Sequence, residues 1–444
     1  MTKNFTRGSI SRAIVHFALP LLLGNLLQQL YSVVDTVVVG RFVGYRALAS
    51  IGASTAVVQL LIGFALGITN GISVETAQAL GANEENKVRK SIAIGLILSL
   101  SVSLIFSGLG IVSVRPLYSL LQTPNDILDG TIQYSIIMFI GAPVTLLYNY
   151  VSAILRAFGD SKTPTIGLLI ATVLNILLDL TFVILFGWGI KGVAVATLIS
   201  QMISGVICGF YALKHIPMMR TKKDDFTWNA EIVSEQLKVG IPMAFHQSVL
   251  AIGSLFMQAV LNTLGSMTIA AYTLAVRIDV ILYAGLSAFG TTVTTFTAQN
   301  YGAGRLDRIK KAVRFTSKVT VCICLFFVLA LLAFSPQIMK IFIGNNEVEV
   351  IRLGVMYVRI NSLFYPLLGI MFVILHAQQG LGRPGIAMCS SLVELAIRPV
   401  AALVLAQQFG FAGFRFANAI AWSCSFTMLV VSYAIIMRKL ERRL

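Results

Sequence analysis

The chain has 444 residues, of which 57% are hydrophobic and only 12% are charged. This composition excludes a water-soluble globular protein, because most of the folded surface has to face hydrocarbon. The net charge of +16 does not call for a nucleic acid partner, since basic loops of membrane proteins contact anionic lipid headgroups.

Twelve apolar stretches follow one another along the chain, bounded by charged residues, Gly or Pro. The hydrocarbon core of a bilayer is about 30 Å thick and needs roughly 20 apolar residues per helix. The sequence therefore predicts an all-α integral membrane protein with twelve transmembrane helices. We expect them near residues 13–38, 47–74, 92–114, 131–155, 164–186, 190–213, 237–263, 267–297, 313–335, 355–377, 385–407 and 411–437.

The two halves of the sequence are copies of one unit. The heptad Thr76–Ala82 (TAQALGA) returns 221 residues later as Thr297–Ala303 (TAQNYGA), and each copy ends a long apolar stretch. Repeated bundles with an even number of spans insert the same way up and are typical of secondary transporters. The polar segment between the bundles could hold a surface helix from Trp228 to Lys238 or be solvated coil. The predicted parts are an N-terminal six-helix bundle (1–214), a cytoplasmic linker (215–236) and a pseudo-symmetric C-terminal six-helix bundle (237–444).

The distribution of Lys and Arg predicts the orientation in the membrane. With the N-terminus inside, 23 of these residues fall in cytoplasmic segments and six in outer segments. The positive-inside rule then places both termini in the cytoplasm. The first apolar stretch is too long for the core of a signal peptide, so we expect it to be retained. The compact loops and the lack of a targeting peptide indicate a prokaryotic inner (plasma) membrane.

The sequence contains no nucleotide-binding or hydrolytic motif. It has no G-x-x-x-x-G-K-[ST], H-E-x-x-H or G-x-S-x-G, so we expect a transporter rather than an enzyme, without a cofactor and without ATP hydrolysis. An ion gradient remains as the source of energy. The five cysteines lie within predicted helices. We expect them to pack as small apolar residues rather than to form a disulfide or a metal site.

Four polar residues share one depth of the predicted N-terminal bundle. An ionisable side chain inside a span costs about 2.5–3.5 kcal/mol or more and marks a cavity or a partner. Asp35 lies in the first span, Asn175 and Asp179 share one face of the fifth, and Thr197 enters from the sixth. Such a carboxylate pair can bind a proton or a monovalent cation, and Asn and Thr oxygens can complete Na⁺ coordination. Alternatively, each Asp caps a backbone break or satisfies a neighbouring hydroxyl.

The predicted C-terminal bundle contains two further acids, each near an arginine. Glu394 and Arg398 are four apart on one helix and can pair. Arg277 and Asp279 are two apart and could pair only across helices. We expect a gating or ion-pair network, with contact to a substrate as the alternative. Glu75, at the cytoplasmic end of the second span, could hold the repeated Gln and the following basic loop in place.

With these motifs, the chain resembles the MATE (multidrug and toxic compound extrusion) transporters over almost its full length. The resemblance rests on twelve spans, an acid in the first helix, A-Q-x-x-G-A at the end of the second and eighth spans, and Asn-x-x-x-Asp in the fifth. It points to the DinF-like branch, because the NorM-like branch has a glutamate in the seventh helix, where this chain has His246 and Gln247. The residues that the resemblance implies for binding H⁺ or Na⁺ are Asp35, Asn175, Asp179 and Thr197.

The resemblance also implies a function. Transporters of this kind export amphipathic, often cationic compounds in antiport with H⁺ or Na⁺, as two bundles alternate between outward-open and inward-open V shapes around a central cavity. We expect small organic substrates and membrane lipids as partners, no nucleic acid, and a monomer. A flippase for lipid-linked oligosaccharide or peptidoglycan precursors is the alternative, although more spans and more cavity arginines would be expected for it. The candidate cavity residues are Gln28, Tyr31, Tyr148, Asn149, Met257, Gln258, Tyr283 and Phe289.

Overall fold

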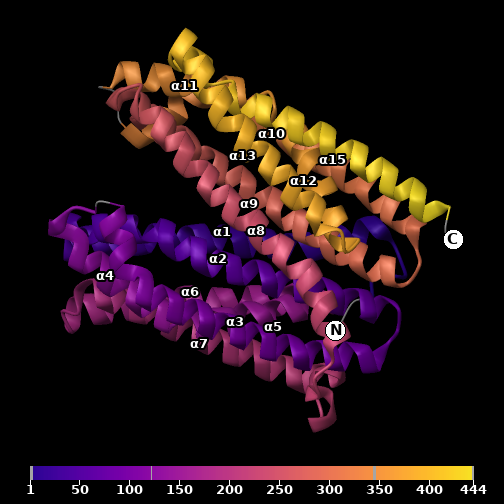
Figure 1. Cartoon of the computed structure of the whole chain (residues 1–444). Helices are drawn as coiled ribbons and strands as arrows, with labels where there is room; N and C mark the ends of the chain where they lie inside the picture. Colours follow the sequence, from indigo (N-terminus) through magenta and orange to yellow (C-terminus); the bar gives the residue numbers. More distant parts are fainter. Residues whose placement is uncertain (1–3, 122, 344–346, 443–444) are drawn as a thin grey trace. The chain divides into compact units, whose positions relative to one another are not determined.

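The computed structural model describes residues 4–121, 123–343 and 347–442, which are almost entirely helical and contain no strand (Figure 1). This confirms the predicted all-α class. In chain order the elements are α1 (Ile10–Val38), the π-helical segment η1 (Val39–Val43), α2 (Tyr45–Gly81), α3 (Glu85–Leu120), α4 (Asn125–Ile140), α5 (Ala142–Ala157), α6 (Lys162–Leu180), the π-helical segment η2 (Thr181–Leu185), α7 (Gly189–His215), the 3₁₀ turns η3 (Pro217–Met219) and η4 (Lys223–Phe226), α8 (Ala230–Asn262), α9 (Ser266–Gly302), α10 (Leu306–Ile343), α11 (Val348–Ser362), α12 (Tyr365–Gly380), α13 (Pro384–Phe409), α14 (Phe411–Phe414) and α15 (Ala417–Glu441).

Most of these helices are suited to cross a membrane. In the described part of the chain, nine spans are long and apolar enough, and the bent pairs α4–α5 (48°) and α11–α12 (52°) can each act as one more. Pro143 and Pro366 lie in the first turn of the helix after each bend. Proline is tolerated in the first turn of a helix, but it cannot continue the helix that precedes it. The remaining predicted span, 237–263, lies on α8, which is not among these eleven.

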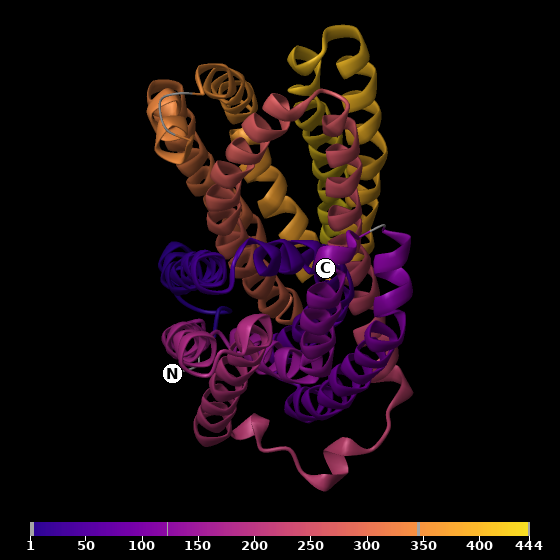
Figure 2. The same ribbon diagram turned by 90° about the vertical axis from the view of Figure 1, so that its left-hand side faces the viewer.

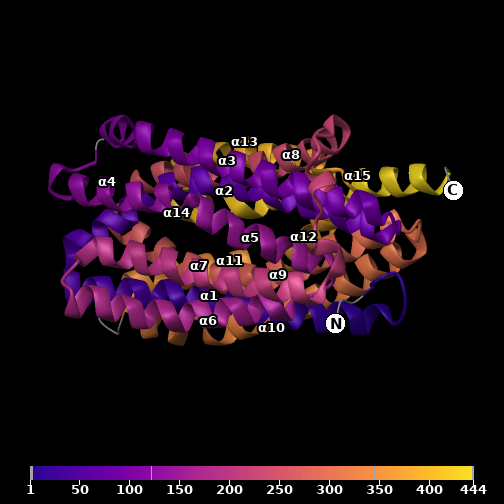
Figure 3. The same cartoon turned by 90° about the horizontal axis from the view of Figure 1, so that it is seen from below.

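The helices form two compact units. The first contains His16–Ser248, the residues up to Gly8, and Ala298–Gly304. The second contains Ser9–Val15, Val249–Thr297 and the chain from Arg305 onward. Within the first unit α6 and α7 lie side by side (Figure 3), and within the second α13 and α15 do so (Figure 2). The bundle boundaries predicted from the sequence follow the membrane topology and stay a prediction.

Small residues let α2 and α8 touch backbone to backbone inside the first unit. A Cβ atom added to Gly67 would lie 2.3 Å from the Cα of Ala244, and one added to Gly71 would lie 2.3 Å from the Cα of Gly240. Gly67 and Gly71 are four apart, as are Gly240 and Ala244, so each helix presents a small-x-x-x-small face. Faces of this kind allow close packing of helices in membranes.

The two copies of the repeated heptad pack against each other within the first unit. A Cβ atom added to Gly81 would lie 1.9 Å from the carbonyl oxygen of Gln299, and one added to Gly302 would lie 1.9 Å from that of Gln78. The contact is reciprocal, because the glycine of each copy rests on the glutamine backbone of the other. The side chain of Gln299 also accepts a hydrogen bond from the amide of Phe5 (2.9 Å) and donates one to the carbonyl of Ala157 (2.6 Å). The repeat is thus a packing element as well as a trace of duplication.

The segment predicted as a surface helix or solvated coil at 228–238 contains the first turns of α8, which begins at Ala230. Asn229 starts the helix, since its Oδ1 accepts hydrogen bonds from the amides of Glu231 and Ile232. Ile232 and Val233 are buried against Ile94 of α3. The structure thus agrees with the amphipathic-helix alternative from Ala230 onward: one face packs on α3, while Glu231 and Lys238 are exposed.

Candidate functional site

Three of the predicted cation-site residues meet directly. Asn175 and Asp179 are one turn apart on α6, and both side chains are fully buried. Asp35 of α1 is half-buried. With the amide nitrogen of Asn175 turned towards the acids, it lies 3.1 Å from Oδ2 of Asp179 and 3.0 Å from Oδ1 of Asp35. One amide group therefore bridges two carboxyl groups from different helices.

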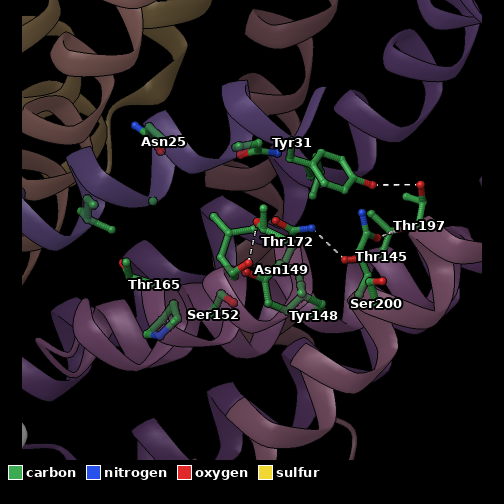
Figure 4. A pocket seen from close by; sticks show the side chains of 18 of the residues that line it. Asn25, Tyr31, Thr145, Tyr148, Asn149, Ser152, Thr165, Thr172, Thr197 and Ser200 are labelled. Atoms are coloured by element: carbon green, nitrogen blue, oxygen red, sulfur yellow. Dashed lines mark hydrogen bonds between the residues drawn. The ribbon is translucent and has the colours of Figure 1, made fainter. Parts of the chain in front are cut away.

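The fourth residue, Thr197 of α7, joins the group through a tyrosine. The hydroxyl of Tyr31 donates a hydrogen bond to Oγ1 of Thr197 at 2.9 Å (Figure 4). Thr197 in turn donates to the carbonyl of Val193 at 3.0 Å. Tyr31 lies one turn before Asp35 on α1, so it links Thr197 to the helix that carries the first acid. The structure thus gathers all four predicted residues from three helices.

The two acids are not neutralised by a basic side chain in the part of the chain that the structure describes. Within the described residues, neither Asp35 nor Asp179 forms an ion pair with Lys or Arg, and Oδ1 of Asp179 is buried without a hydrogen-bond partner. The two carboxyl groups are close neighbours, because both approach the same amide nitrogen of Asn175, at 3.0 and 3.1 Å. Two adjacent carboxylates in a site of low dielectric repel each other strongly, so the pair is suited to hold a shared proton or a monovalent cation.

A π-helical segment follows each acid. Segment η1 begins four residues after Asp35, and η2 begins two residues after Asp179. The two segments pack against each other. A π turn inside a membrane helix is uncommon and occurs often at functional sites. The backbone next to both acids therefore departs from regular α-helix.

Two adjacent cavities open beside this cluster in the first unit. One has a volume of 230 Å³ and contains Tyr148 and Asn149 in its lining; part of it is shown in Figure 4. The other has a volume of 400 Å³ and is lined in part by Asp35. The cavities share the lining residues Gln28, Tyr31, Thr197 and Gln201. Four of the candidate substrate residues, Gln28, Tyr31, Tyr148 and Asn149, therefore line cavities next to the acid pair.

The other four candidate substrate residues lie in the second unit. Met257 is part of its hydrophobic core, and Phe289 is buried. Tyr283 packs against the same core, with its ring centroid 5.7 Å from that of Phe372, whereas Gln258 is exposed. Their expected contact with a substrate stays a prediction.

The acids of the second unit differ in their partners. Glu394 and Arg398 form the expected ion pair on α13. Asp279, although buried, accepts a hydrogen bond from the hydroxyl of Tyr365. The described residues show no ion pair between Asp279 and Arg277, and the side chain of Arg277 is exposed. Residues two apart on α9 point to different sides of the helix, as their spacing predicts, and Asp279 finds a partner on another helix, α12. The expected gating or ion-pair network stays a prediction.

Glu75 of α2 lies in the first unit, near the repeated heptads, in a cluster that joins α2, α3 and α8. Its carboxylate accepts a hydrogen bond from the hydroxyl of Ser91 on α3. Lys87, from the basic segment after α2, lies 3.9 Å from Glu75 and 2.8 Å from Glu235 of α8. Gln236 donates to the hydroxyl of Ser91 at 3.0 Å. The structure thus ties Glu75 to the basic segment, as predicted, and also to α8.

Sequence reasoning missed many lining residues of the cavities, among them Tyr134 and Gln201. Tyr134 of α4 lines the same cavity as Asp35 and interacts electrostatically with both acids of the pair. Gln201 follows Thr197 by one turn on α7, and its side-chain oxygen accepts a hydrogen bond from Thr145 at 2.6 Å. Helical spacing from Thr197 could have identified Gln201, since a half-buried amide in an apolar helix needs a partner. Tyr134 belongs to no motif that would have marked it.

Comparison with known proteins finds a family that matches both halves of the chain. The MatE family matches residues 20–181 and 242–404, which cover most of both halves. The chain belongs to the MatE family. It is therefore a multi-pass membrane transporter and not an enzyme.

Relatives and solved structures agree with this assignment. "Probable multidrug resistance protein YpnP" of Bacillus subtilis is 29% identical over 392 residues, which cover 88% of this chain and 86% of the relative. A protein of Shewanella oneidensis named "FAD transporter" is 25% identical over 403 residues, which cover 89% of this chain and 88% of the relative. Among solved structures, "Crystal structure of MATE in complex with MaL6" matches with a TM-score of 0.94 at 23% identity and covers 100% of both chains. This last likeness shows the fold.

Proposed function

We propose that this MatE transporter exports amphipathic, often cationic organic compounds in antiport with H⁺ or Na⁺ by alternating access. The observation that carries the proposal is the acid pair, Asp35 and Asp179, bridged by Asn175 without a basic partner and next to a cavity. The name of the relative YpnP, a probable multidrug resistance protein, supports drug-like cargo. The transporter works as a monomer in the inner membrane, with both termini in the cytoplasm and no cofactor besides the coupling ion.

Coupling depends on the charge of the pair. When the pair is empty, its negative charge favours a cationic compound in the adjacent cavity. When H⁺ or Na⁺ binds, that attraction is lost. Tyr31 and Thr197 are hydrogen-bonded to each other in the cavity wall close to Asp35. A change at Asp35 can therefore be passed through them to the bound compound. An ion can drive a conformational change only through its different affinity for the two states. The pair supplies such a difference in both charge and hydrogen bonding.

The test is transport in proteoliposomes under an imposed pH gradient and, separately, an Na⁺ gradient. Rhodamine 123 serves as the fluorescent cation, and the variants are Asp35→Asn and Asp179→Asn. Asp126→Asn is the matched control, because Asp126 is an exposed acid of α4 outside the cavities. We expect each site variant to reduce gradient-driven transport by at least about tenfold, as is common when a group used in coupling is removed, while the control transports normally.

The outcome names the coupling ion or rejects the site. The gradient that drives wild-type transport identifies H⁺ or Na⁺. Normal transport by both folded site variants would contradict the role of the pair. The relative named "FAD transporter" makes FAD a second candidate cargo, to be added in the same vesicles. Transfer of an undecaprenyl-linked sugar, with no transport of either dye or FAD, would favour the flippase alternative.

A further inference from the structure

A row of polar side chains on α5 faces the 230 Å³ cavity. Tyr148, Ser152 and Arg156 follow one another at intervals of four, so they share one face of the helix, and all three line that cavity. Arg156 is the only charged residue among the described residues of its lining. The row therefore offers hydroxyl and guanidinium donors to whatever occupies the cavity.

Two of these donors have unused capacity. Ser152 is 2% exposed, and its Oγ, whose nearest described polar neighbour on the row is the hydroxyl of Tyr148, forms no hydrogen bond in the described part of the chain. Arg156 makes no ion pair with a described acid. Leaving a buried donor unpaired destabilises the protein. Arg156 is in the last turn of α5, where a positive charge is favoured by the helix dipole, but that effect does not explain the buried unpaired hydroxyl of Ser152.

The neighbouring cavity has the opposite charge. Asp35 is the only charged residue among its described lining residues. An anionic group would be repelled there and attracted to Arg156, whose planar guanidinium can donate two parallel hydrogen bonds to a carboxylate or phosphate. The two adjacent cavities, which share lining residues, thus favour groups of opposite charge.

We propose that Arg156, Ser152 and Tyr148 form a subsite for an anionic oxygen group, a carboxylate or a phosphate, of the exported compound. The proposal rests on the export function above and extends its cargo from cations to zwitterions and anions. Arg156 supplies the charge, and Ser152 and Tyr148 donate hydrogen bonds to the same group. The acid pair is not needed for this binding.

The experiment measures binding to purified wild-type protein and to Arg156→Gln by fluorescence titration with two matched pairs of probes. Rhodamine 110 carries a free carboxyl group that is a methyl ester in rhodamine 123, and FMN carries a phosphate that riboflavin lacks. We expect Arg156→Gln to weaken binding of the anionic member of at least one pair by about tenfold, as for loss of a charge-assisted hydrogen bond. Binding of rhodamine 123 and riboflavin should change less than about twofold, since neither can use the charge.

Further variants protect the test against misfolding. Arg156→Lys keeps the charge and should retain most of the preference for the anionic probe. If Arg156→Gln does not yield folded protein, Ser152→Ala carries the comparison, with an expected loss of about threefold for the anionic probe alone. The probe pair whose anionic member loses affinity shows whether the subsite prefers a carboxylate (rhodamine 110) or a phosphate (FMN).

Two results would overturn the subsite: equal weakening of both members of each pair, or unchanged binding of all four probes in folded Arg156→Gln. These results concern binding, whereas the proposed antiport is tested by transport. Selective loss of anion binding together with no gradient-driven transport in wild type would sustain the subsite and reject the antiport.

Discussion

Tyr31 is the residue that most closely connects the proposed cation site with the two cavities beside it. Its hydroxyl donates to Thr197, it lies one turn from Asp35, and it lines both cavities. A side chain in this position can respond to the acid pair and contact cargo at the same time. Loss of its hydroxyl should therefore affect coupling rather than stability alone.

We predict that Tyr31→Phe raises the concentration of coupling ion that gives half-maximal transport by about three- to tenfold, the usual effect of losing one hydrogen bond. Transport assays with graded ion concentrations provide the measurement. Tyr118→Phe is the control, because the hydroxyl of Tyr118 hydrogen-bonds Ser135 at 2.7 Å in a buried position away from both cavities. An identical response of the two variants would show that the effect is not specific to the site.

At the residue scale, the sequence predicted those contacts that arise within one helix. The spacing of Asn175 and Asp179 placed them on one face, and Glu394 with Arg398 followed from the same rule. Contacts between helices are set by packing, for which a single sequence carries little signal. This is why Tyr134 was missed and why the hydrogen bond from Tyr365 to Asp279 was not predicted.

At the scale of elements, the reciprocal contact of the two heptads makes a strong prediction about glycine. Gly81→Ala would place a methyl group on the backbone oxygen of Gln299, which cannot move as freely as a side chain. We expect a destabilisation of about 1–3 kcal/mol or more, typical of an overpacked core. Thermal unfolding of the detergent-solubilised protein measures it.

Gly63→Ala is the matched control on the same helix, because a Cβ atom there would meet no heavy atom within 4 Å. Removing a helical glycine without a clash should leave the unfolding temperature unchanged or slightly raised. If Gly81→Ala were equally harmless, the close approach of the two heptads would not occur in the protein.

Helix ends and bends were less predictable than helix positions. The spans 131–155 and 355–377 were expected as single helices, yet each is a pair bent at a proline-containing start. The prolines were visible, but apolar length alone does not show where a span bends. The π-helical segments η1 and η2 were not predicted, because one extra residue per turn leaves no clear mark on hydrophobic periodicity.

At the scale of the whole molecule, composition, apolar length and the internal repeat sufficed to predict an all-α membrane protein. The solvent explains this success, since a bilayer leaves helices as the only spanning structure that such long apolar stretches can form. The residues of the proposed cation site were predicted as a group because ionisable residues at membrane depth are rare. The cavities required the structure, since the way that α1, α5 and α7 surround them depends on packing.

The orientation in the membrane gives a prediction at this scale. Both termini are expected in the cytoplasm because most Lys and Arg fall on that side. Green fluorescent protein fused to the C-terminus should fluoresce, and alkaline phosphatase fused there should be inactive. Phosphatase fused after Gly187, in a predicted outer loop, should be active. The reverse pattern would invert the topology and place the basic segments outside.

The π-helical segments next to the two acids have a mechanical consequence. Each holds one residue more than the α turn that it replaces, so converting it to α-helix would shift the hydrogen-bond register of the helix beyond it by one position. One position corresponds to a rotation of about 100° and a rise of about 1.5 Å. Since η1 and η2 touch, a register change in one would press on the other. The arrival of a single charge could thus be converted into a screw motion of two helices at once.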